Sequence, residues 1–102
     1  MNMNKSILNK IKIKNLKIIK LREGNIMHVI KKKELKKWNP AEIYFSKVKF
    51  GKVKAWKYHK KMSLNLTVPL GKVKFVFYPG KGNKFKVVQI GEKKYARLIV
   101  PP

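Results

Sequence analysis

The sequence predicts an all-β domain, and two features of the chain support this prediction. Polar residues, mostly lysine, alternate with aliphatic or aromatic residues in many short stretches, as expected of strands that bury one face. Glycine-containing turns separate these stretches at intervals typical of β-sandwiches and barrels. With 102 residues, 44% of them hydrophobic, the chain suits one domain with one core, spanning residues 1–102.

The N-terminal strands are expected within residues 10–30. KIKIKNLKIIK (10–20) places Ile11, Ile13 and Leu16 between polar residues, and this alternation predicts a half-buried strand. A turn at Gly24 follows, and IMHVI (26–30) predicts a second strand. KKKELKKW (31–38) is the one credible helical stretch, and the Asn-Pro pair after it would end the helix.

The barrel strands are expected within residues 42–102. Six stretches predict consecutive strands: EIYFSKVKF (42–50), KVKAWKYH (52–59), LNLTVPL (64–70), KVKFVFY (72–78), KFKVVQI (84–90) and YARLIV (95–100). Turns are expected at Gly51, Gly71 and Gly91 and in PGKGN (79–83), because glycine, proline and asparagine favour turn conformations.

The chain is strongly basic. It has 27 Lys and Arg residues against 4 acidic residues, for a net charge of +23, and only Arg22 and Arg97 are arginines. A polyanionic partner would explain this charge. Arginine, however, is the usual residue for bidentate recognition of bases and phosphates. The lysine bias, together with abundant Asn and Ile, therefore favours codon usage in an AT-rich genome as the main cause.

Several kinds of site are not expected. Cysteine is absent, which excludes disulfides and thiolate metal sites. His28 and His59 are the only imidazoles and the four Glu residues are scattered, so the sequence offers no metal-binding set. Neither a phosphate-binding glycine loop before a helix nor a nucleophile elbow is present. Without an apolar run of signal-peptide or membrane length, a cytoplasmic location is expected.

Aromatic residues interleave with lysines on two of the predicted strands. These aromatics are Trp56, Tyr58, Phe75, Phe77 and Tyr78. They would stack bases if the domain resembled single-strand-binding barrels, or they would fill the core. In a domain this small, the core interpretation is favoured because aromatic side chains supply much of the area that such a core buries.

Three segments together show a family resemblance: IKNLKIIKLREGNIMHVI (13–30), EIYFSKVKFGKVKAWKYHKKMSLNLTVPLGKVKFVFY (42–78) and YARLIVPP (95–102). They resemble the cupin-type dTDP-4-dehydrorhamnose 3,5-epimerases and related sugar-nucleotide isomerases. The resemblance implies a cupin-like jelly roll, or double-stranded β-helix, usually paired as a homodimer. It also implies a dTDP-linked 4-keto-6-deoxy sugar as substrate, and a reaction that uses neither a metal nor an organic cofactor.

The resemblance implies that the catalytic base comes from residues 53–59. In the family, a His on this strand removes the proton next to the keto group, and Lys57 occupies that position here. A lysine acts as a base only in its neutral form, which burial and cationic neighbours such as Lys60 favour. His59 lies two residues further on the same strand face and is the alternative base.

Four further residues match substrate-binding positions of the family. Lys54 matches the basic residue that contacts the diphosphate, and Glu23 stands where an Arg next to a glycine contacts the nucleotide. His28 matches a polar position that helps to hold the nucleotide, and Asn65 fits the following strand.

The family's barrel continues beyond the segment that YARLIVPP matches, and its later strands hold a Tyr that acts as the acid. The sequence has no counterpart of these strands after Pro102. We therefore expect a jelly roll that is incomplete at the C-terminus and has an open sheet edge. A second copy of the chain or a separate C-terminal chain would cover that edge.

Two functions are compatible with these observations. The first is an epimerase- or isomerase-like protein of deoxysugar or surface-polysaccharide biosynthesis, which abstracts a proton next to a C4 ketone. The alternative is a non-enzymatic basic β-domain that binds nucleic acid. Lysine–phosphate contacts would dominate that binding and would weaken steeply with salt.

Overall fold

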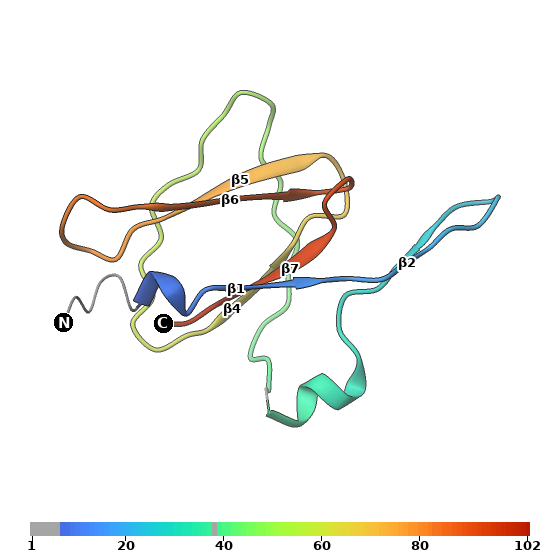
Figure 1. The fold of residues 1–102 in the computed structure, drawn as a ribbon, viewed down its shortest axis with the longest axis horizontal. Helices are drawn as coiled ribbons and strands as arrows, with labels where there is room; N and C mark the ends of the chain where they lie inside the picture. Colours follow the sequence, from blue (N-terminus) through green and yellow to red (C-terminus); the bar gives the residue numbers. More distant parts are fainter. Residues whose placement is uncertain (1–6, 38) are drawn as a thin grey trace.

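The central element of the protein is a three-stranded antiparallel sheet. The structure, a computed structural model, describes residues 7–37 and 39–102. In the sheet, β7 (Ala96–Val100) lies between β1 (Lys12–Asn15) and β4 (Leu64–Thr67), so the strand order is β1-β7-β4 (Figure 1). The two ends of the described chain thus pair with each other, and β4 joins from the middle of the sequence.

Two antiparallel hairpins supply the other strands. β5 (Lys72–Phe77) pairs with β6 (Lys86–Gly91) along its whole length. β2 (Ile18–Ile19) and β3 (Ile26–Met27) form a shorter hairpin, which projects from one end of the molecule (Figure 1). The all-β prediction is confirmed for the described residues.

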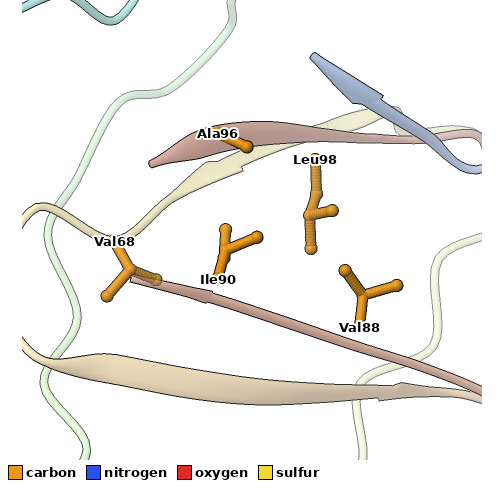
Figure 2. Packing of buried hydrophobic residues seen from close by; sticks show 5 residues of the cluster. All are labelled: Val68, Val88, Ile90, Ala96 and Leu98. Carbon is orange, nitrogen blue, oxygen red and sulfur yellow. The ribbon is translucent and has the colours of Figure 1, made fainter. Parts of the chain in front are cut away.

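The core lies between the β5–β6 hairpin and one face of the sheet. Val88 and Ile90 of β6 point toward Ala96 and Leu98 of β7, and Val68 closes one end of this cluster (Figure 2). The register explains the arrangement, because alternate residues of each strand point to the same side. Partly buried hydrophobic residues pack around the cluster: Leu66, Val73, Phe75, Phe77 and Val100.

The predicted N-terminal strand over residues 10–20 is divided into two. β1 pairs with β7, whereas β2 pairs with β3. The chain changes partner at residues 16–17: Leu16 donates its backbone N–H to Tyr95, and Lys17 accepts one from His28. The alternation breaks beside this point, at the polar pair Lys14 and Asn15 and at the apolar pair Ile18 and Ile19, so the sequence carries a signal for the change of partner that the prediction of one strand did not use.

The helical prediction over residues 31–38 is correct in position but not in type. Residues Lys32–Lys37 form a 3₁₀ helix, η1, and Trp38 lies outside the described residues. Glu34 accepts a hydrogen bond from the backbone N–H of Lys31, a contact typical of a helix start.

Two strand predictions, at residues 42–50 and 52–59, are wrong. Residues 39–63 form a long loop without strand structure, and its side chains are mostly exposed, including the fully exposed Phe50. Within the loop, the backbone N–H of Lys52 donates to Lys49 at 3.0 Å and closes a turn. A strand needs a hydrogen-bonded neighbour. The alternating pattern is present here, but no strand of the described chain lies in register beside it.

Candidate functional site

Three of the candidate residues lie on the second half of the long loop. Lys54 donates from its Nζ to the Ser46 Oγ at 2.7 Å, and the Lys57 Nζ lies 5.9 Å from the centre of the Tyr44 ring. His59 is half-buried, whereas Lys54 and Lys57 are exposed. The two halves of the loop are therefore connected by side chains, and the second half runs beside the first (Figure 1).

The other three candidates come from different parts of the fold. Glu23 is exposed in the turn between β2 and β3, and His28 is half-buried just after β3. Asn65 is half-buried on β4, where it lies opposite Ile99 of β7. The β2–β3 hairpin projects from the opposite end of the molecule to the loop segment of residues 54–59 (Figure 1). Within one chain, Glu23 and residues 54–59 therefore lie too far apart to form one site.

A buried arginine on the second face of the sheet was missed by sequence reasoning. Arg97 is only 5% exposed, and its side chain lies on the face opposite the core, in register with Lys14 of β1 and Thr67 of β4. Its guanidinium donates to the Glu34 Oε2 at 2.5 Å and to the backbone carbonyl of Val29 at 2.6 Å. These contacts hold the segment that contains η1 against the sheet.

Glu34 is the acceptor at the centre of this ion-pair cluster of Lys14, Glu34 and Arg97. The Lys14 Nζ lies 2.6 Å from the same Oε2 that Arg97 contacts. The hydrogen bond from Arg97, and then those from Lys14 and the Lys31 backbone, lower the pKa of Glu34 from 4.5 to about 2. The sequence offers a weak signal for the cluster, because it has few acidic residues and only two arginines.

The low pKa of Glu34 predicts how stability changes with pH. The pKa of Glu34 is about 2 in the folded chain and 4.5 when the side chain has no such partners, as in the unfolded chain. The carboxylate therefore stabilises the fold fully above pH 4.5. This contribution is lost as the pH falls through the folded pKa. We expect Glu34→Gln to lower the melting temperature at pH 7, and the two proteins to converge as the pH approaches about 2.

The matched control for this prediction is Glu42→Gln, which removes the same charge from an exposed position. Thermal melts of the wild type and both variants between pH 7 and pH 2 provide the measurement. Equal melting temperatures of the wild type and Glu34→Gln at pH 7 would contradict a stabilising role for the ion-pair cluster.

Three exposed rings form an aromatic row of Trp56, Tyr78 and Phe85. The centres of the Trp56 and Tyr78 rings are 6.5 Å apart, and those of Tyr78 and Phe85 are 5.0 Å apart with the rings stacked at 28°. The residues are 68%, 41% and 54% exposed, respectively. The row joins the long loop to the end of the β5–β6 hairpin.

The core interpretation of the aromatic residues is therefore correct for only some of them. Phe75 and Phe77 pack against the core cluster and stack on each other with ring centres 6.4 Å apart. Trp56, Tyr58 and Tyr78 are exposed, so the core prediction is wrong for these three. Trp56 and Tyr58 are on the long loop, which forms no second layer for them to pack against.

Two classes of feature are absent from the described residues. Within residues 7–37 and 39–102, no three His, Cys, Asp or Glu side chains are grouped so that they could hold a metal ion. No helix in the same part of the chain is long and apolar enough to cross a membrane.

Comparison with known proteins returned no match: no family model, curated protein or solved structure is similar to the chain. The resemblance of residues 13–30, 42–78 and 95–102 to the sugar-nucleotide epimerases therefore stays a prediction.

Proposed function

We propose that the protein is a cupin-like jelly-roll domain that binds a dTDP-linked 4-keto-6-deoxy sugar and acts as an epimerase or isomerase. Its place would be in deoxysugar or surface-polysaccharide biosynthesis. The observation on which the proposal rests most is the resemblance of residues 42–78, which contain the proposed base and the diphosphate contact.

The layering of the strands supports the proposed jelly roll. The chain leaves the three-stranded sheet after β4, forms the β5–β6 hairpin over the core, and returns to the sheet as β7. β7 then pairs with β4 on one side and with β1 on the other. Two antiparallel layers linked by such crossings are the elements from which jelly rolls are built.

In the proposed reaction, a base removes the proton from the carbon next to the C4 ketone. The electrons of the C–H bond form an enolate, whose negative charge develops on the ketone oxygen, and a water molecule then gives a proton to the opposite face of that carbon. His59 is the better base of the two candidates, because a neutral imidazole accepts a proton directly. Lys57 is exposed, and its Nζ lies 5.9 Å from the centre of the Tyr44 ring, in the first half of the loop.

The lysines suit the electrostatic part of this reaction. As ammonium groups, Lys54 and Lys57 would contact the diphosphate or the developing oxyanion, since lysine binds phosphate as a point charge. His28 and Asn65 are the proposed nucleotide and sugar contacts. The β2–β3 hairpin, whose turn contains Glu23, projects from the far end of the molecule (Figure 1). A site that uses both Glu23 and Lys54 therefore requires them from two copies of a homodimer.

Isotope exchange tests the proposal directly. With the dTDP-4-keto-6-deoxy sugar in D₂O, we expect the wild type to exchange the proton next to the ketone for deuterium. His59→Ala should slow this exchange by about 100-fold, because general acid–base catalysis typically contributes at least that factor. Lys52→Ala is the matched control, since it removes an exposed lysine from the same long loop without removing a proposed group. Unchanged exchange in both His59→Ala and Lys57→Ala would remove both residues as the base.

A binding control separates a failure of catalysis from a failure of recognition. Thermal melts in moderately high salt are compared without ligand, with dTDP and with ADP, because ligand that binds only the folded state raises its melting temperature. A larger shift with dTDP than with ADP supports a thymidine-selective site. Equal shifts would contradict the proposed substrate class, since they would show only charge-driven binding.

A further inference from the structure

The turn between β5 and β6 holds two rings of the aromatic row in fixed positions. The last residue pair of the hairpin is Phe77 and Lys86, so Tyr78 and Phe85 face each other directly beyond it. The Tyr78 hydroxyl donates to the Gly82 carbonyl at 2.8 Å and ties its ring to the turn. Gly82 has a φ of 82°, a left-handed conformation that glycine adopts without strain, which permits this closure.

The third ring comes from the long loop, which places Trp56 beside Tyr78. Trp56 has no strand partner, and its ring is the most exposed of the three. A large aromatic ring left in water loses the free energy that burial would provide, so an exposed row of three rings indicates a surface that a partner covers.

The charge around the row indicates which partner this is. No acidic residue occurs between Glu42 and Glu92, and lysines adjoin two of the three rings in the sequence, Lys57 next to Trp56 and Lys84 next to Phe85. A second copy of this chain that docked through the same row would bring two lysine-rich surfaces together, so the proposed homodimer would use another surface. A polyanion is attracted to this surface, and a polyanion that carries planar aromatic groups can also stack on the rings.

We propose that the aromatic row is a binding surface for single-stranded nucleic acid. Unpaired bases stack on the rings of Trp56, Tyr78 and Phe85, while the neighbouring lysines contact the phosphates. Single strands fit better than duplexes, because the bases of a duplex are already stacked on one another and present only phosphates to such a surface. The proposal rests on the three rings, whereas the sugar-nucleotide function rests on His59 as the catalytic base and on a ligand with a single nucleobase. Lys57 is the one residue that has a role in both.

The test is a binding titration with a fluorescent deoxythymidine oligonucleotide of about 12 nucleotides, within the range that single-strand-binding domains cover. We expect Trp56→Ala and Phe85→Ala each to weaken binding about tenfold, the effect of losing one stacked base. Phe50→Ala is the matched control, because it removes a fully exposed ring from the same long loop, outside the row, without changing the charge. We expect its affinity to stay within about twofold of the wild type.

A duplex of the same length is the second arm of the test. Its binding rests on lysine–phosphate contacts, so it should fall steeply with salt and change little in the ring variants. The proposal is overturned if Trp56→Ala and Phe85→Ala bind the single strand as well as the wild type does. It is also overturned if Phe50→Ala loses as much affinity as they do, or if they weaken duplex binding equally. Thermal melts of each variant confirm that the compared proteins are folded.

Discussion

Replacing Leu98 by alanine is expected to lower the free energy of unfolding by about 3 kcal/mol, because it leaves a cavity at the centre of the core. Leu98 is 0% exposed and lies on β7, the middle strand of the sheet. Ile13 and Leu66 flank it on the neighbouring strands. Domains of this size have a total stability of about 5–15 kcal/mol, so the variant should lose a large share of it. Urea unfolding followed by circular dichroism measures the loss.

The control for this substitution is Leu70→Ala, which deletes the same atoms from a side chain that is 81% exposed. We expect it to change stability by no more than about 0.5 kcal/mol, as surface substitutions usually do. If Leu98→Ala and Leu70→Ala were equally stable, the core would not lie between β7 and the β5–β6 hairpin.

Gly91→Ala is expected to cost about 3 kcal/mol or more, at the upper end of the range for overpacking. A Cβ on Gly91 would collide with the carbonyl oxygen of Gly71 and would lie 2.7 Å from the Cα of Lys72. These are backbone atoms of the partner strand, since Gly91 pairs with Lys72 at the start of β5. They cannot move without opening the hairpin. Opening the hairpin would also break the hydrogen bond that the Glu92 N–H donates to the Gly71 carbonyl at 2.9 Å.

Gly24→Ala is the control, because a Cβ there would meet nothing within 4 Å. Its φ of 145° still makes alanine unfavourable, by an amount on the order of 1 kcal/mol. Chemical unfolding of both variants distinguishes the two causes. A loss at Gly91 no greater than that at Gly24 would show that the two strands do not approach as closely as the structure describes.

The local hydrophobic pattern was sufficient to predict the strands that form the core. KVKFVFY and KFKVVQI were expected as strands, with a turn at residues 79–83, and β5 and β6 occupy these stretches. LNLTVPL and YARLIV contain β4 and β7. In each case the alternating residues match a face that packs on the core, so the pattern and the tertiary structure agree.

The candidate site was predictable only as a set of residues, not as an arrangement. Alternation placed Lys57 and His59 on one face of a strand, but the segment is part of the long loop. Phe85 was not singled out, because its place beside Tyr78 depends on the pairing of β5 with β6. Arg97 and Glu34 are far apart in the sequence, so their contact is visible only when η1 lies against the sheet.

The sequence by itself determined that this protein is built from strands, where most turns fall, and that the surface is strongly basic. These properties follow from single residues and their neighbours: alternation selects a face, glycine permits turns, and lysine carries charge. Only the tertiary structure decided that residues 42–50 and 52–59 are not strands, and that Trp56, Tyr78 and Phe85 form one row. The reason is that a strand exists only beside another strand, and its hydrogen-bonding partner comes from a distant part of the chain.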